Sequence, residues 1–369
     1  MKTIGVALIG CGGIALANHV PGLALCPGAR IVALCDSNPQ ALENAAQKTA
    51  VSTTTTEYQE VLRRGDVDAV IIATPNLTHA PITLEAVAAG KHVFCEKPIA
   101  MNFDEAANMH QAAEKGGVRH MTAFTYRFVP AMRYMAHLVR AGHIGQPVHF
   151  RVQRFQDWGA RPLGWRQSAA MAGTGELGDM LSHRIDYGHF LVGPIARVSA
   201  SLKRFIETRG GQKSDLDDWV AALAEFDNGA TGVLESSKLC TGRGEGGRSL
   251  DYCEVNGTEG TLVYSLGKPL ELEVGHRNGT HLETVAVPGE FLVWPGSPRQ
   301  PREGDPLVTF RYDQDFEFID AIRNQRACVP SLLEGARVQA VMDAMVQSSA
   351  QRKWVEVAQT HKGSVGSVL

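Results

Sequence analysis

The stretch Ile4-Gly-Val-Ala-Leu-Ile-Gly10-Cys-Gly12-Gly-Ile-Ala15 decides the fold predicted for this chain. A short apolar run, typical of a buried strand, leads directly into G-x-G-x-x-A and then into a helical pattern. This is the context in which the motif binds a dinucleotide. Gly10 permits a tight turn, Gly12 lets the backbone approach a pyrophosphate, and Ala15 keeps the helix close to the strand. Because the N–H groups at a helix N-terminus favour phosphates, the stretch predicts a dinucleotide site.

An acidic residue stands where such a site needs one. A second apolar strand, Arg30–Asp36, ends on a carboxylate 24 residues after Gly12. In a Rossmann unit, an acid about 20 residues beyond the glycines hydrogen-bonds the ribose hydroxyls. A carboxylate there repels a 2′-phosphate, so the sequence favours NAD over NADP. The alternative is that Asp36 only begins the turn Asp-Ser-Asn-Pro39 and caps the next helix.

The composition limits the class of protein. A chain of 369 residues predicts two domains or one large one, and 44% apolar with 20% charged residues is ordinary for a globular protein. The net charge of −3 offers no basic stripe, so no nucleic-acid partner is expected. Seven cysteines without a C-x-x-C pair suit a reducing cytoplasm and predict no metal site. No signal peptide or spanning segment is visible, so we expect a cytoplasmic protein without a membrane partner.

The first third of the chain alternates strand and helix patterns. Apolar strands are predicted at 69–74, 92–95 and 120–124, and helical patterns at 14–25, 39–49, 78–89 and 103–115. This alternation is typical of a parallel sheet with helices on both faces. We therefore predict an α/β fold whose first domain, residues 1–124, is a doubly wound Rossmann domain.

The pattern changes at residue 125, where a second domain, residues 125–369, is predicted. Turn signals at Asp-Asn-Gly229 and Gly-Thr-Glu-Gly260 separate alternating runs, which predicts hairpins of an antiparallel sheet. The expected elements are helices at 130–141, 176–191, 312–323 and 333–350, strands at 148–155, 218–226, 230–239, 250–256 and 261–265, and a long loop at 284–311. This part of the chain therefore reads as an α+β domain.

Two segments of the first domain carry polar residues at the ends of strands. They are Ala73–His79 and Cys95-Glu96-Lys97-Pro98. Ligands of open parallel sheets bind beyond the carboxyl ends of the strands. A lysine there, beside a nicotinamide, can hydrogen-bond or protonate a substrate oxygen, and partial burial would lower its pKa. The alternative is a solvated surface lysine followed by a turn proline.

The second domain offers a partner for Lys97 in the segment Gly175–Asp186, which is predicted to open a helix. Asp179 and His183 are four residues apart and share a helix face, and Asp186 is a neighbour three residues further on. A histidine oriented by carboxylates suits proton removal from an alcohol. The alternative is a capped helix with one polar face.

Together these segments resemble the Gfo/Idh/MocA family of NAD(P)-dependent oxidoreductases over essentially the whole chain. The motifs that carry the resemblance, in family order, are GCGGIA at 10–15, ATPNLTH at 73–79, EKP at 96–98, YRFVPA at 126–131 and GTGELGDMLSHRIDYGHFLVG at 173–193. In this family the lysine of EKP and the Asp and His of the helix form the active site. The resemblance thus implies Lys97, Asp179 and His183 as catalytic residues, and a large, open, mainly antiparallel second sheet.

The resemblance also implies binding residues. For the cofactor these are Gly10, Gly12, Gly13, Ile14, Asp36, Ser37, Thr74, Pro75, Asn76, His79, Glu96, Lys97, Arg127, Trp165 and Arg166. For the substrate they are Lys97, Tyr126, Asp157, Trp158, Arg166, Asp179 and His183. Tryptophan rings can cover the C–H side of a sugar, and polar groups can bond its hydroxyls. The alternatives are tryptophans that anchor a core or interface, and an Arg127 that pairs with an acid.

The expected activity is NAD-dependent oxidation of a secondary ring hydroxyl to a ketone. The second domain is most similar to sugar dehydrogenases of the family, including those acting on anhydrosugars such as levoglucosan, and the similarity weakens after residue 265. No Arg/Lys cluster marks a phosphate here, so a free sugar, anhydrosugar or cyclitol is expected. The alternatives are an inositol or aldose dehydrogenase, an NAD-dependent glycosidase and a non-catalytic sugar or nucleotide sensor. An open sheet face would favour a homodimer or homotetramer.

Overall fold

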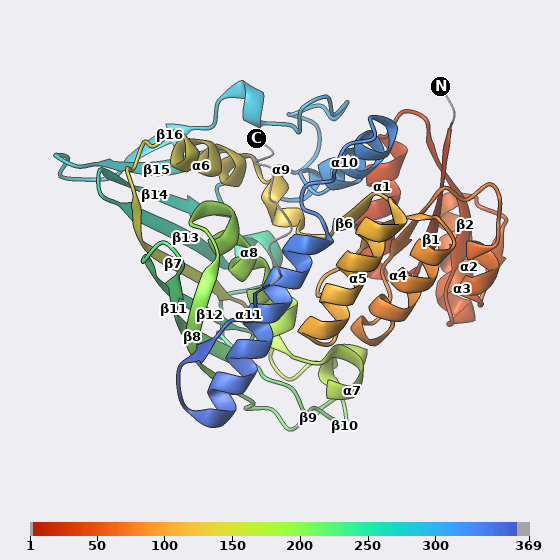
Figure 1. Cartoon of the computed structure of the whole chain (residues 1–369), viewed down its shortest axis with the longest axis horizontal. Helices are drawn as coiled ribbons and strands as arrows, with labels where there is room; N and C mark the ends of the chain where they lie inside the picture. Colours follow the sequence, from red (N-terminus) through yellow and green to blue (C-terminus); the bar gives the residue numbers. More distant parts are fainter. Residues whose placement is uncertain (1–2, 360–369) are drawn as a thin grey trace.

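A parallel sheet forms the first part of the molecule. The structure, a computed structural model, describes residues 3–359 (Figure 1). The six strands lie in the order β3-β2-β1-β4-β5-β6, all parallel, which is the doubly wound Rossmann order. Their bounds are β1 Ile4–Ile9, β2 Ala29–Cys35, β3 Thr54–Thr55, β4 Ala69–Ile72, β5 His92–Cys95 and β6 His120–Thr122. The predicted fold of this part is confirmed.

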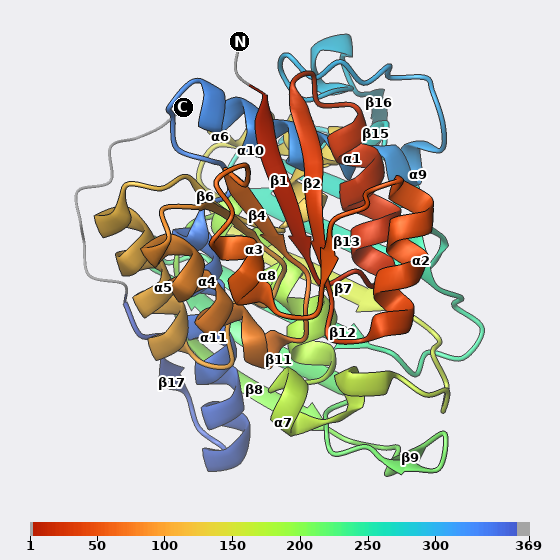
Figure 2. The ribbon, with the colours of Figure 1, turned by 90° about the vertical axis from the view of Figure 1, so that its right-hand side faces the viewer.

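The helices of this part cover both faces of the sheet, as Figure 2 shows. Because both faces are covered, every residue of β1 and β4 is buried, which explains their uninterrupted apolar sequences. The bounds are η1 Ala15–His19, α1 Val20–Ala24, α2 Pro39–Thr49, α3 Tyr58–Leu62, η2 Asn76–Thr78, α4 His79–Ala88 and α5 Phe103–Gly116. Helix α2 has its predicted bounds, and its N-cap is Asn38, whose side chain accepts the Gln40 N–H.

The second sheet is larger and mainly antiparallel. Its order is β16-β15-β14-β13-β7-β12-β11-β8-β17, and only β7 and β12 run parallel. The bounds are β7 Pro147–Phe155, β8 Ile195–Lys203, β11 Trp219–Phe226, β12 Thr231–Ser237, β13 Leu250–Gly257, β14 Gly260–Ser265, β15 Glu271–His276, β16 Glu283–Ala286 and β17 Val355–Glu356. Both predicted hairpins, β11–β12 and β13–β14, are confirmed.

Among residues 3–359, helices cover only one face of this sheet (Figure 1). The covering helices are α6 Pro130–Arg140, α8 Ser182–Leu191 and α11 Leu332–Gln351. Along β11, Val220, Ala222 and Ala224 are buried, whereas Leu223 on the other face is 51% exposed. The second sheet is therefore open, as expected.

The last helices join the two sheets. Helix α10, Tyr312–Arg323, packs on α1, and α11 lies between α5 and β8. The remaining elements are η3 Thr125–Phe128, η4 Gly164–Gln167, α7 Ala169–Ala172, η5 Leu177–Leu181, β9 Thr208–Arg209, β10 Gln212–Lys213, η6 Gly246–Arg248, η7 Gly289–Phe291 and α9 Pro306–Thr309. Within residues 3–359, the helices are all too short or too polar to span a bilayer. The division at residues 124 and 125 stays a prediction.

Candidate active site

The glycine turn after β1 has the shape that a dinucleotide requires. Gly10 has φ +95°, and a Cβ there would lie 2.5 Å from the carbonyl carbon of Ala73, so only glycine fits. A Cβ on Gly12 or Gly13 would meet nothing within 4 Å, so the turn opens onto free space. The Asp36 carboxylate accepts the Cys11 N–H at 2.7 Å and thereby fixes the turn to the end of β2. The residues present therefore fit a dinucleotide whose pyrophosphate lies against bare backbone.

A cavity of about 500 Å³ lies between the carboxyl ends of β4 and β5 and helix α8. The predicted residues that line it are Ile14, Thr74, Asn76, His79, Glu96, Lys97, Tyr126, Trp158, Trp165, Arg166, Asp179 and His183. Those outside its lining are Gly10, Gly12, Gly13, Asp36, Ser37, Pro75, Arg127 and Asp157. The structure thus brings the three predicted catalytic side chains into one cavity, while the role of each stays a prediction.

Lys97 and Asp179 meet in this cavity. Lys97 follows β5, and its Nζ donates to the carbonyl oxygen of Asp179 at 2.5 Å and to Asp179 Oδ1 at 3.3 Å. Burial raises the pKa of Asp179, but the positive charges of Lys97, Arg166 and Lys238 outweigh it and leave this pKa below its usual range. Asp179 is therefore a carboxylate at neutral pH, and it holds the lysine ammonium in place.

His183 packs among aromatic rings. Its ring meets Tyr126 edge to face at 4.7 Å between centroids, and its buried Nδ1 has no hydrogen-bond partner within residues 3–359. Burial holds the pKa of His183 well below its usual range, and the charges of Lys97 and Arg184 act in the same direction. The imidazole is therefore neutral at neutral pH and able to accept a proton.

The expected carboxylate partner of His183 is engaged elsewhere. Asp179 bonds Lys97, and Asp186 accepts two hydrogen bonds from Arg127, at 2.7 and 2.5 Å. Asp179 lies in η5, a π-helical turn, and no hydrogen bond joins it to His183 in the described part of the chain, although both residues line the cavity. Arg127 therefore pairs with an acid, which was the alternative to a role in cofactor binding. Its role toward the cofactor stays a prediction.

A buried series of charged side chains, which the sequence did not indicate, leads to the backbone of Lys97. His19 Nδ1 lies 2.8 Å from Asp315 Oδ1, and its Nε2 lies 3.1 Å from Glu96 Oε1. Glu96 Oε2 in turn accepts the backbone N–H of Lys97 at 3.2 Å. Burial lowers the pKa of His19, but Asp315 and Glu96 raise it to about 10, so His19 is a cation. The partners lie 77 and 296 residues from His19, a separation at which no local pattern links them.

Two arginines that the sequence did not indicate, Arg161 and Arg311, line the cavity beside the predicted Arg166. Arg311, just before α10, has its guanidinium 5.4 Å from the Tyr126 ring centroid. Arg161 lies 5.0 Å over Trp158, and Arg166 lies 4.3 Å over Trp165. The sequence predicts no Arg/Lys cluster for a phosphate, whereas Arg161, Arg166 and Arg311 all line the cavity.

Two family models match the chain. One, described as an oxidoreductase family with an NAD-binding Rossmann fold, matches residues 4–124. The other, the GFO/IDH/MocA C-terminal domain, matches residues 132–263. The two matches follow one another along the chain and together cover the glycine turn, Lys97, Asp179 and His183.

Named relatives are similar over the full length. A levoglucosan dehydrogenase of Pseudarthrobacter phenanthrenivorans is 32% identical, over 97% of this chain and 99% of that protein. An inositol 2-dehydrogenase of Rhizobium meliloti is 26% identical, over 96% of this chain and 100% of that protein. A solved levoglucosan dehydrogenase in complex with NADH and levoglucosan has a TM-score of 0.88 and 31% identity, over 97% of this chain and 100% of that chain.

Proposed function

Because the chain belongs to the Gfo/Idh/MocA family of oxidoreductases, we propose that it oxidises a secondary ring hydroxyl of a free sugar, a levoglucosan-like anhydrosugar or a cyclitol to a ketone. It is an NAD-binding dehydrogenase that acts on CH–OH groups. The observation that carries the proposal is the meeting of Lys97, Asp179 and His183 in one cavity at the carboxyl ends of β4 and β5.

Each side chain has a chemical task in this proposal. The nicotinamide, when bound, supplies the hydride acceptor. The ammonium of Lys97, held by Asp179, hydrogen-bonds the oxygen of the reacting hydroxyl and polarises it. The neutral imidazole of His183 receives the hydroxyl proton, either directly or through Lys97. Asp179 keeps the ammonium in place or binds a neighbouring hydroxyl.

The cavity wall supports a cyclic polyol as substrate. Trp158 and Trp165 line it with aromatic surface that suits the C–H side of a ring. Arg166 and Asp179 provide a donor and an acceptor for hydroxyl groups, and a site built for such bonds rejects analogues that lack the oxygen. The relatives named for levoglucosan and inositol are consistent with this class.

The test is absorbance at 340 nm with NAD, and separately NADP, against levoglucosan, aldoses and inositols. We expect reduction of NAD with at least one cyclic polyol, and slower reduction of NADP. No reduction across the panel would contradict the proposal. Protein that keeps NAD through purification but gives no net reduction would instead indicate a glycosidase that oxidises its substrate transiently.

We further propose that the open face of the second sheet joins copies of the chain into a homodimer or homotetramer in the cytoplasm. The support is the exposed Leu223 on a sheet face that no helix of residues 3–359 covers. Light scattering during size-exclusion chromatography measures the mass. A Leu223→Glu variant that still has the wild-type mass would contradict this interface.

A further inference from the structure

A second cavity of about 760 Å³ lies on the other side of the elements that form the active-site wall. In η3, Tyr126 lines the active-site cavity and the next residue, Arg127, lines the second one. In α8, His183 lines the active-site cavity and His189 lines the second. The two cavities therefore share walls but differ in lining, and the second belongs to no part of the proposed reaction.

Cationic side chains without acidic partners line this second cavity. Within residues 3–359, neither Arg119 nor Arg140 forms an ion pair. Arg127 and Arg140 lie 4.7 and 4.6 Å from the ring centroid of Phe190, so two guanidinium groups share one aromatic ring. Burial lowers the pKa of Arg140, and the charge of Arg127 lowers it further. The negative charge of an anion beside Arg140 would oppose this lowering of its pKa.

The wall also carries polar atoms that lack a partner. The Nδ1 atoms of His189 and His110 are buried, and neither has a hydrogen-bond partner in the described part of the chain. Burial, together with Arg127 and Arg337, lowers the pKa of His189 to about 3, so its ring is neutral and has one N–H. Both Nδ1 atoms are enclosed by protein, so a ligand in the cavity would meet His189 at its other ring nitrogen, Nε2.

The charge of the wall favours a negative ligand. The lining contains four arginines, of which Arg127 is neutralised by Asp186. The acidic lining residues are Glu114 and Glu334, and Ser331 already donates two hydrogen bonds to Glu334. The three other arginines exceed these two carboxylates by one positive charge. The planar guanidinium group of an arginine matches the paired oxygens of a phosphate or carboxylate.

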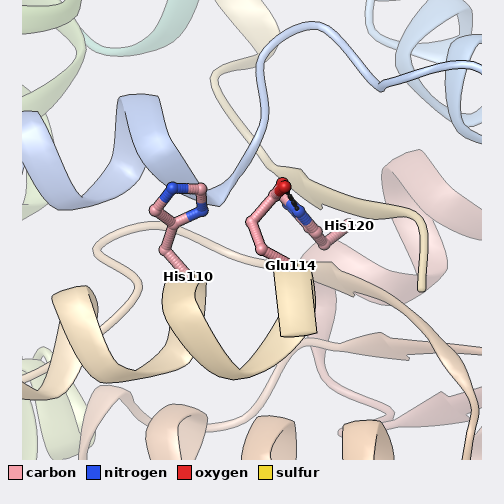
Figure 3. Close-up of side chains that lie close together, drawn as sticks. All are labelled: His110, Glu114 and His120. Atoms are coloured by element: carbon pink, nitrogen blue, oxygen red, sulfur yellow. Dashed lines mark hydrogen bonds and ion pairs between the residues drawn. The ribbon is translucent and has the colours of Figure 1, made fainter. Parts of the chain in front are cut away.

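A metal ion fits this wall less well, although three possible ligands meet there. Figure 3 shows His110 and Glu114 on α5 with His120 on β6, and their ligand atoms lie within 4.8 Å of one another. The Nδ1 of His120 accepts the Leu332 N–H at 3.2 Å, so the proton of the neutral ring is on Nε2, which donates to Glu114 at 2.8 Å. A metal on Nε2 would force a proton onto Nδ1, facing the Leu332 N–H. Metal-bound histidines donate from their second nitrogen, and this one accepts.

We propose that the second cavity is a binding site for a small oxyanion, a phosphate or carboxylate group, held by Arg140 and Arg119 with the ring N–H of His189 as a further donor. The site is separate from the dinucleotide turn and from Lys97. The anionic group of the ligand lies beside α8 and the start of α11 in this proposal.

Isothermal titration of the NAD-saturated protein tests this proposal, because NAD then occupies the phosphate-binding turn. The probes are inorganic phosphate and, separately, citrate, each at constant ionic strength set with sodium chloride. We expect one site per chain for at least one probe, and the comparison shows whether phosphate or carboxylate is preferred. In Arg140→Met the Kd should rise about tenfold or more, because a charge-assisted contact is lost.

Two further variants keep the test decisive. Arg63→Met removes the same charge at an exposed position directly after α3, away from this cavity, and it should leave the Kd unchanged. Arg140 is a partly exposed residue in the last turn of α6 and lines no part of the active-site cavity, so its variant should fold and reduce NAD as the wild type does. The proposal is wrong if neither probe binds, or if Arg140→Met binds them as the wild type does. Tight binding of zinc chloride that is lost in His110→Ala would also overturn it, in favour of a metal.

Discussion

Lys97 and Asp179 join the two sheets of the molecule through one short contact. The lysine follows β5 of the parallel sheet, the aspartate lies in η5 below the second sheet, and their side chains meet at 3.3 Å. Neither partner is fully exposed: 14% of the lysine side chain and 18% of the aspartate side chain are accessible. The contact places the lysine ammonium in the cavity that Ile14 of the dinucleotide motif also lines, where the proposed reaction needs a donor to the substrate oxygen.

Removal of the Lys97 ammonium tests its role. In Lys97→Met we expect kcat to fall by about 10²-fold or more, the scale of a positioned acid–base group. The Kd for NAD should change little, because the glycine turn and Asp36 stay in place. Steady-state kinetics and NAD titration measure the two effects, with the exposed Lys115→Met as the matched control. Near-full turnover in Lys97→Met would exclude this lysine from the mechanism.

The pH dependence tests His183. Burial holds the pKa of this imidazole well below its usual range, so the neutral base persists when the pH falls through 6.5. We therefore expect no loss of kcat between pH 8 and 6.5 that depends on His183. In His183→Asn, kcat should fall by about 10²-fold or more at every pH. A fall of kcat on acidification near the ordinary pKa of histidine, absent in His183→Asn, would contradict the assignment of His183 as a base that stays neutral.

The buried series of charged side chains around His19 makes a prediction about stability. Its pKa is raised to about 10 in the folded protein, so its contribution is complete below about pH 6.5 and is lost as the pH rises toward 10. His19→Asn leaves Asp315 and Glu96 without their shared cation and should cost about 3–5 kcal/mol at pH 6. Urea unfolding at pH 6 and pH 10 measures the cost, which should be smaller at pH 10. An equal cost at both values would show that His19 carries no charge.

Two glycines of the turn should respond differently to the same substitution. Gly10→Ala puts a Cβ against the Ala73 carbonyl at a positive φ, so the variant should unfold at a lower temperature. Gly12→Ala meets no atom within 4 Å, so its melting temperature without NAD should match the wild type. Its Kd for NAD should nevertheless rise, because the methyl group occupies the space left for the pyrophosphate. Melting curves with and without NAD distinguish the two variants. Equal melting temperatures and equal responses to NAD would contradict the separate roles of the two glycines.

The choice of cofactor should depend on Asp36. In Asp36→Ser the repulsion of a 2′-phosphate is removed, and the ratio of kcat/KM for NAD over NADP should fall about tenfold or more. Initial rates with both cofactors measure this ratio. An unchanged ratio would mean that Asp36 serves only the Cys11 N–H that it accepts in the structure.

The parts of the fold that follow from local pattern were predictable. Helix α2 has its predicted bounds because Asn38 and Pro39 mark its start. Helix α10 also has its predicted bounds, although its buried residues include Asp313, Asp315 and Glu317. Strand β8 was missed, although Gly193 and Pro194 precede it and its residues have the mixed burial of a strand with one covered face. The π-helical turn before α8 was also missed, since sequence periodicity does not distinguish it from a regular helix.

The candidate site was predictable only where a motif names its residues. Lys97, Asp179 and His183 stand in motifs, and they line one cavity. His19, Asp315 and Arg311 stand in none. Because α10 packs against α1 and η3, Arg311 lines the cavity and Asp315 connects through His19 to Glu96. Such contacts depend on how distant helices pack, and local sequence patterns do not predict that packing.

Transfer of hydrogen from the substrate ring to NAD is the measurement that tests the central claim most directly. The enzyme would be incubated with NAD and a ring-deuterated substrate from the reactive panel, and mass spectrometry would follow both products. We predict reduced cofactor that carries one deuterium, together with a ketone that has lost it. Unlabelled reduced cofactor, or labelled sugar recovered with NAD unchanged, would contradict hydride transfer from a ring carbon.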